Sequence, residues 1–115
     1  MALYPPPEAR TLDRVFQALA DPTRRAIVSR LAEGEASVTE IARPFPLSLP
    51  AVTKHLQVLE RAGLLQHEKR GRVRHCHLVG SRMEPAATWL ERYRGFWDTR
   101  LTSLSDYFRS QKETS

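Results

Sequence analysis

The chain contains a single cysteine, Cys76, among its 115 residues. One thiol excludes any disulfide framework within the chain and fits a reducing compartment. No stretch approaches the roughly 18 consecutive apolar residues of a membrane-spanning helix. The first ten residues, which include Pro5, Pro6 and Pro7, have neither the basic segment nor the apolar core of a secretory signal. These absences favour a cytoplasmic protein with no membrane partner.

The chain also lacks the usual signatures of catalysis. No phosphate-binding glycine loop, Ser–His–Asp arrangement or pair of carboxylates stands out in the sequence. It does carry positive charge, because 18 Lys and Arg against 13 Asp and Glu give a formal net charge of +5. A small basic chain attracts polyanions, of which nucleic acid is the commonest. We therefore expect a binding protein that is not an enzyme and needs no cofactor.

One domain is expected over residues 11–109, between a flexible proline-rich arm at 1–10 and a flexible tail at 110–115. Capping residues and glycines divide the first half of this domain into four helices, with a short extended piece at Val38. Ser37 and Glu40 match a capping box at the start of the third helix. Either Ser37 or Thr39 caps this third helix. The other expected starts and stops, in chain order, are Thr11, Asp21, Gly34, Ser48 and Gly63.

The fourth helix is amphipathic. Val52, Leu56 and Leu59 recur at helical spacing and form one buried stripe. The other face is small or polar near the N-terminus, so it can enter a major groove and reach base edges, while the free N–H groups of the first turn can bind a phosphate. The expected DNA-binding residues of this helix are Ser48, Pro50, Ala51, Thr53, Lys54, His55 and Gln57.

Two short strands, Leu64–Glu68 and Val73–Leu78, follow this helix, and the segment Lys69–Arg72 forms the turn between them. Four cationic side chains and one carboxylate lie within residues 66–77, which indicates a clamp on the phosphate backbone. The alternative is that these arginines only protect an exposed strand edge from pairing. The expected backbone contacts are Lys69, Arg70, Arg72 and Arg74.

Three histidines in the hairpin raise the alternative of a metal site. His75 and His77 share one face of their strand, while Cys76 lies on the opposite, core-facing side. A buried thiol usually packs as a small apolar group, and histidines in a basic hairpin more often contact phosphate or water. We expect no metal site among them or His67.

A long helix is expected from about residue 84 to residue 109. Its apolar residues from Leu90 to Phe108 recur at spacings of three and four, as in a coiled coil. One helix of a small domain cannot bury so many aromatic rings, so a symmetric partner is favoured over an intrachain core. The expected dimer-interface residues, on the first and last helices, are Leu12, Phe16, Trp89, Leu90, Tyr93, Trp97, Leu101, Leu104 and Phe108.

Several stretches resemble the arsenical-resistance-repressor-like (ArsR-type) transcriptional regulators. Residues 16–27, FQALADPTRRAI, resemble the opening helices of that family, and residues 37–42, SVTEIA, resemble its third helix. Residues 47–65 resemble its recognition helix and the entry to its wing. Residues 89–97 resemble a branch that does not sense metals. The likeness covers about residues 12–80.

This resemblance implies a mainly α, winged helix-turn-helix fold of about five helices and one β-hairpin wing that dimerises through its terminal helices. It implies a sequence-specific repressor, bound as a homodimer to a palindromic operator in double-stranded DNA. The recognition helix would lie in the major groove and the basic wing on the backbone. Metal-sensing members carry a cysteine pair near the third helix or His and Asp ligands on the last one. Neither set is present here, so no metal site is carried over.

The sequence leaves other readings open. Activation rather than repression is compatible with the same DNA-binding parts, and no residue identifies a small-molecule effector. The rival interpretation is an adaptor that uses its aromatic last helix to bind proteins and no longer reads DNA. Salt-dependent binding to a specific duplex distinguishes the DNA reader from this rival.

Overall fold

A computed structural model describes residues 7–114 of the chain. The chain divides into two compact units, with the boundary between Glu84 and Pro85. The sequence predicted a single domain over residues 11–109. The second unit coincides with the helical segment that was expected to mediate dimerisation.

The first unit contains four α-helices: α1 (Pro7–Leu19), α2 (Pro22–Ala32), α3 (Val38–Ala42) and α4 (Leu49–Arg61). A 3-10 helix, Gly80–Met83, follows the sheet. Helix α1 begins ahead of Thr11, so the arm expected at 1–10 is helical from Pro7 onward. Proline suits this first position because the N–H that it lacks would have no helical partner there. The rest of the expected arm lies outside the described residues.

The expected caps of the inner helices are confirmed. Asp21 Oδ2 accepts a hydrogen bond from the backbone N–H of Arg24 at 3.0 Å, and this bond lowers the pKa of Asp21. Ser37 Oγ accepts from the N–H of Glu40 at 3.1 Å, while Glu40 Oε1 accepts from the N–H of Ser37 at 3.3 Å. These reciprocal bonds complete the capping box and fix the start of α3.

The sheet has three antiparallel strands in the order β1 (Ala36–Ser37), β3 (Val73–Leu78) and β2 (Leu65–Arg70). The expected hairpin is present but longer, because β2 continues to Arg70 and leaves a two-residue turn. Gly71, the first residue of that turn, has φ +64°, a conformation that favours glycine. The extended piece expected at Val38 is wrong, since Val38 begins α3 and the strand lies just before it.

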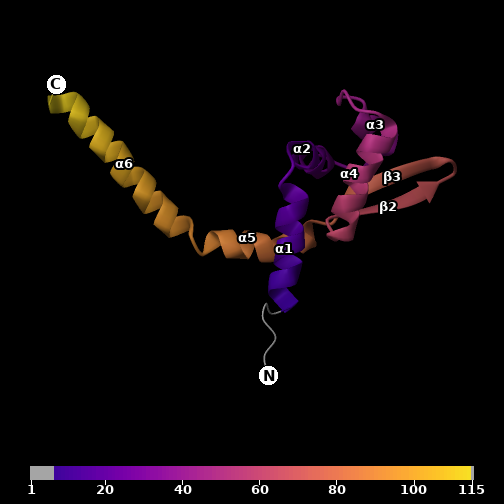
Figure 1. Cartoon of the computed structure of the whole chain (residues 1–115), viewed down its shortest axis with the longest axis horizontal. Coiled ribbons are helices and arrows are strands. Elements are labelled where there is room, and N and C mark those ends of the chain that lie inside the picture. The colour runs from indigo at the N-terminus through magenta and orange to yellow at the C-terminus, as the bar shows by residue number, and fades with distance from the viewer. Residues whose placement is uncertain (1–6, 115) are drawn as a thin grey trace. The chain divides into compact units, whose positions relative to one another are not determined.

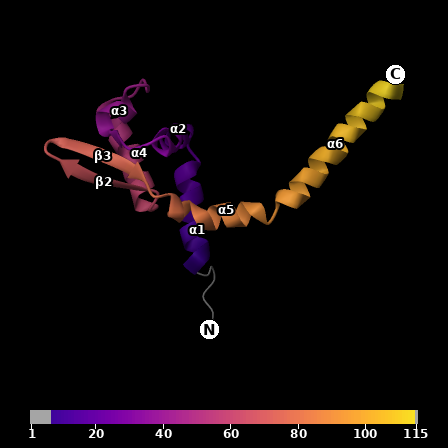
Figure 2. The same ribbon diagram turned by 180° about the vertical axis from the view of Figure 1, so that it is seen from behind.

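The core of the first unit draws on each of its four α-helices and on the sheet. Helix α4 packs against α2 and β2, and α3 packs against α4 and β3. Figures 1 and 2 show the β2–β3 hairpin beside α3 and α4 from both sides. The largest fully buried side chains are Val15, Ile27, Ile41, Val52, Leu59, Leu64, Leu65 and Cys76. The packing therefore holds α4 and the hairpin together as one surface.

The second unit consists of α5 (Glu84–Glu91) and α6 (Arg94–Thr114). The single helix expected at 84–109 is interrupted between Glu91 and Arg94, where the N–H of Tyr93 donates to the carbonyl of Leu90, three residues back, at 3.1 Å. Gly95, a poor helix former, lies just beyond the break. Helix α6 continues to Thr114, so the tail expected at 110–115 is helical up to that residue.

Within residues 7–114 the structure has six α-helices and a three-stranded sheet, rather than about five helices and a hairpin alone. The expectation of a mainly α, winged helix-turn-helix architecture is confirmed. None of the described helices combines the length and the apolar character needed to cross a bilayer.

Candidate nucleic-acid interface

The N-terminus of α4 is open to solvent. Ser48 caps it by accepting a hydrogen bond from the N–H of Ala51 at 3.2 Å, and Pro50 lies in the first turn. Both Ser48 and Pro50 are exposed, and Ala51 is half-buried. The unpaired N–H groups and the positive end of the helix dipole make such a terminus attractive to a phosphate.

One face of α4 is buried and the rest is accessible. Val52, Leu56 and Leu59 form the buried stripe that the sequence predicted. Lys54 and Gln57 are exposed, and Thr53 is half-buried. Short and polar side chains at these positions leave room for a groove wall and can form hydrogen bonds with base edges.

His55 does not lie with these side chains, although the sequence grouped it with the DNA-binding residues. Its ring is 24% exposed, and Nδ1 is 3.3 Å from Nη1 of Arg24 and 3.9 Å from Oδ2 of Asp21. The reason is its position in the helix, on the flank of the buried stripe that faces α2. Arg24 also donates to the carbonyls of Ala18 at 2.6 Å and Gln17 at 3.0 Å, so this cluster joins the ends of α1 and α2 to α4.

The hairpin carries most of the charge beside α4. Lys69, Arg72 and Arg74 are exposed and form no ion pair with another described residue. Arg72 occupies the turn between the two strands. Three such side chains on one projecting hairpin can approach a phosphate backbone without first breaking an internal contact.

Arg70 differs from its neighbours because two carboxylates already surround it. Its Nη1 donates to Glu35 Oε1 at 2.5 Å, its Nη2 donates to Glu35 Oε2 at 3.1 Å, and its Nε donates to Glu68 Oε1 at 2.7 Å. The hydrogen bond with Arg70 lowers the pKa of Glu35, and the same bond raises the pKa of Arg70. The sequence missed this pairing, since no local pattern links residues 35 positions apart. The structure therefore does not present Arg70 as an unpaired cation.

A small cavity of about 220 Å³ is lined by residues of both α4 and the hairpin. His67 on β2 reaches across to α4, where its Nδ1 lies 2.7 Å from Oε1 of Glu60. Cys76 is 1% exposed, as expected for the core side of its strand, and burial raises the pKa of its thiol. Thr53 and Gln57 also line the cavity, so side chains expected to face DNA lie directly beside the wing.

The histidines do not converge on a metal-binding geometry in the described part of the chain, where no group of three or more His, Cys, Asp or Glu residues could hold an ion. His75 and His77 are half-buried on the face opposite Cys76. His75 Nδ1 lies 3.9 Å from Glu35 Oε1, close to the Arg70 pair.

The residues expected at a dimer interface fall in both units. Leu12 and Phe16 lie half-buried on α1. From Trp89 to Phe108, the exposure of the large apolar side chains ranges from 39% at Trp89 to 61% at Leu101. The exposed set comprises Trp89, Leu90, Tyr93, Phe96, Trp97, Leu101, Leu104, Tyr107 and Phe108.

Comparisons with known proteins agree with this geometry. A family model described as a helix-turn-helix domain matches residues 19–68. The HTH-type transcriptional regulator Rv2034 of Mycobacterium tuberculosis is 43% identical over 102 residues, which are 89% of this chain and 92% of that protein.

Solved structures show the same likeness. The crystal structure of an ArsR-family transcriptional regulator is 42% identical, with a TM-score of 0.71 over 85% of this chain and 97% of that one. The homodimeric winged helix-turn-helix DNA-binding domain of a possible ArsR-family regulator from Mycobacterium bovis is 26% identical. Its TM-score is 0.62, over 76% of this chain and 83% of that one.

The fold is thus shared with proteins named as transcriptional regulators. The relatives are named as transcriptional regulators and not as enzymes, which confirms the expectation from the sequence. The chain belongs to the ArsR family of winged helix-turn-helix transcriptional regulators.

Proposed function

We propose that the protein represses transcription by binding a palindromic operator in double-stranded DNA as a homodimer. The observation that carries this proposal is the juxtaposition of the open face of α4 with the cationic hairpin in one packed unit. A helix that fits a major groove and a hairpin that reaches the adjoining backbone occupy neighbouring parts of the same duplex. The proposal places the protein in the cytoplasm, together with its DNA.

In this proposal, helix α4 reads the bases. Thr53, Lys54 and Gln57 contact base edges in the major groove, while Ser48 and the first turn, with Pro50 and Ala51, contact a phosphate. His55 acts indirectly, because its contacts with Arg24 and Asp21 hold α4 at a fixed position relative to α2.

The wing binds the backbone in the same proposal. Lys69, Arg72 and Arg74 supply sequence-independent attraction, and each phosphate contact releases counterions from the DNA. Arg70 supplies less, since Glu35 and Glu68 already neutralise much of its charge.

Dimerisation is proposed to bury the apolar side chains of α5 and α6. A continuous run of exposed, large apolar side chains in a small protein usually marks an interface with another chain. The homodimeric state of the M. bovis domain supports a similar state for this chain. Two copies related by a two-fold axis present two α4 helices, and this symmetry is what makes a palindromic site the fitting target.

Selection from a library of random DNA duplexes tests the proposal. The wild-type protein should enrich a motif of two inverted half-sites whose centres lie about one helical turn apart. The double variant Thr53→Ala/Gln57→Ala should lose the motif yet still retain duplexes at low salt. An adaptor that does not read DNA would enrich no motif in either form, and that result would refute the proposal. Repression itself is tested with a reporter gene carrying the selected motif across its promoter, where activation would contradict it.

A further inference from the structure

A hollow between α1 and the end of α4 has no role in the DNA contacts proposed above. Its volume is about 490 Å³, within the range of roughly 300–1,000 Å³ typical of small-molecule sites. Helix α1 contributes Arg14, Gln17 and Ala18, and α4 contributes Val58, Arg61 and Ala62. Each trio has the spacing i, i+3 and i+4, so each helix turns a single face toward the hollow.

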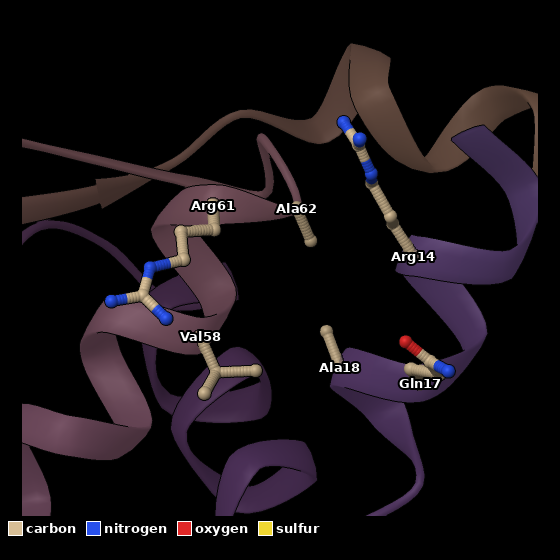
Figure 3. Close-up of a pocket in the computed structure, with 6 residues that line it drawn as sticks. All are labelled: Arg14, Gln17, Ala18, Val58, Arg61 and Ala62. Carbon is tan, nitrogen blue, oxygen red and sulfur yellow. The ribbon is translucent and has the colours of Figure 1, made fainter. Parts of the chain in front are cut away.

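The small side chains create the space. Ala18 and Ala62 point toward one another across the hollow, one from each helix (Figure 3). Ala18 is buried, and Val58 and Ala62 are half-buried, so the floor is apolar and partly shielded from water. A flat apolar group inserted between the two alanines would gain contact with both helices.

The rim of the hollow is cationic. Arg14 rises from the α1 wall, whereas the side chain of Arg61 extends along α4 away from Arg14 (Figure 3). Arg61 is exposed, so its side chain is free to rotate over the rim when an anion binds. Both arginines are exposed and neither forms an ion pair with a described residue, and none of the described residues that line the hollow is a carboxylate. Arg70 and Arg24, by contrast, are engaged in internal hydrogen bonds. Two uncommitted guanidinium groups beside an apolar floor match an anion with an apolar body, since guanidinium pairs a carboxylate through two parallel hydrogen bonds.

We propose that this hollow binds an aromatic monocarboxylate, whose ring lies between Ala18 and Ala62 and whose carboxylate meets Arg14 and Arg61. The volume suits a molecule of one or two fused rings. A polyphosphate fits less well, because half of the lining is apolar and only two cations are present.

Binding at this place has a consequence for DNA recognition, which rests on the function proposed above. Val58, Arg61 and Ala62 lie in the last turns of α4 or at its cap, and the first turn of the same helix faces the DNA. A ligand that favours one spacing of α1 and α4 shifts the population of arrangements in which α4 fits the groove. The hollow is therefore an effector site as well as a binding site.

Direct titration of the full chain with 2-naphthoate, followed by calorimetry without DNA, tests the binding. One molecule per chain should bind, in the low-millimolar range or tighter. Arg14→Gln and Arg61→Gln should each weaken binding about tenfold, as should 2-naphthamide, the neutral isostere of the probe. Ala62→Leu should abolish binding by filling the hollow. Arg10→Gln removes the same charge from α1 outside the hollow and should leave the affinity unchanged.

Several results would overturn the proposal. They are the absence of saturable binding, equal affinity for the naphthamide, or wild-type affinity in both arginine variants, whose folding circular dichroism would verify. Affinity for the selected duplex at saturating 2-naphthoate tests the effector role separately. A change in affinity that Arg14→Gln removes supports this role, and an unchanged affinity with intact probe binding refutes it. Failure to bind any duplex, with probe binding intact, would instead count against the proposed function and leave the site standing.

Discussion

Arg70 on the wing strand β2 and Glu35 in the connection from α2 to β1 form a bidentate ion pair, with Nη1 2.5 Å from Oε1 and Nη2 3.1 Å from Oε2. Glu68 adds a second carboxylate to the same guanidinium. This pair ties the far end of the hairpin to the body of the first unit. Arg70 is therefore a structural cation of the wing, whereas Lys69, Arg72 and Arg74 are available to DNA.

The first prediction follows from this difference. Arg72→Ala should lower the slope of log Kd against log salt concentration by about one ion per subunit, because it removes one phosphate contact. Arg70→Ala should lower the slope clearly less, since its charge is already balanced by Glu35 and Glu68. Titrations of a single random-sequence duplex at several salt concentrations provide the measurement. Equal losses of slope in the two variants would show that the ion pair opens on the DNA.

Part of the wing could be foreseen from sequence. The two short strands, the glycine at the turn and the density of cations predicted a basic hairpin, and the structure contains one. The pairing of Arg70 with Glu35 could not be foreseen, because it depends on how β1 brings its preceding loop beside the hairpin. β1 itself is only two residues long and has no periodicity to detect.

The helices show the same division. Caps at Asp21, Ser37 and Ser48 are hydrogen bonds within four residues of sequence, so the local sequence was enough to place them. The orientation of His55 depends on the neighbouring helix α2 and could not be derived from α4 alone. The break between α5 and α6 was not foreseen, because the heptad pattern runs through it without interruption. It is marked by the hydrogen bond from the N–H of Tyr93 to the carbonyl of Leu90. Helix caps and turns can therefore be predicted from a few neighbouring residues, whereas contacts between segments distant in the sequence cannot.

The second prediction concerns base reading. Gln57→Ala should cost about 1–3 kcal/mol of binding free energy on the best selected duplex and relax the preference at one position per half-site. Gln57 is exposed on α4, so its loss should not perturb the core. Competition against single-base variants of the duplex measures the preference. Arg72→Ala is the control and should weaken all these duplexes nearly equally. The reverse pattern would assign base recognition to the wing, through the minor groove.

The third prediction concerns assembly. Trp97→Ala combined with Leu101→Ala should weaken the homodimer, because both remove large apolar side chains from the exposed seam of α6. Sedimentation equilibrium should give twice the chain mass of 13.2 kDa for the wild type and a lower average mass for the double variant at the same concentration. Thr102→Ala, on the opposite face of α6, should leave the mass unchanged. A monomeric wild-type protein, with and without DNA, would contradict the proposed interface.

The fourth prediction concerns the start of the helix-turn-helix. Ser37→Ala should lower the free energy of unfolding by about 1 kcal/mol, since it removes the hydroxyl that accepts from the N–H of Glu40. Ser29→Ala, an exposed substitution within α2, should change it much less. Urea denaturation monitored by circular dichroism measures both. A loss in Ser29→Ala as large as that in Ser37→Ala would show that the capping box contributes nothing specific.

The last prediction concerns the thiol of Cys76. Burial raises its pKa above the ordinary value, with a further contribution from the negative charge of Glu60. In the unfolded chain the thiol titrates at about pH 8.5. Because the folded pKa is the higher one, the stabilisation is fully present below the unfolded pKa and is lost as the pH rises through the folded pKa. The free energy of unfolding should therefore fall more steeply above about pH 8.5 in the wild type than in Cys76→Ala, where this titration is absent. Urea denaturation of both proteins between neutral and alkaline pH measures the difference, in which the titrations of Lys and Tyr cancel. A difference that stays constant across this range would mean that the thiolate is as well solvated in the folded protein as in the unfolded chain, and that the cavity beside the wing admits water to Cys76.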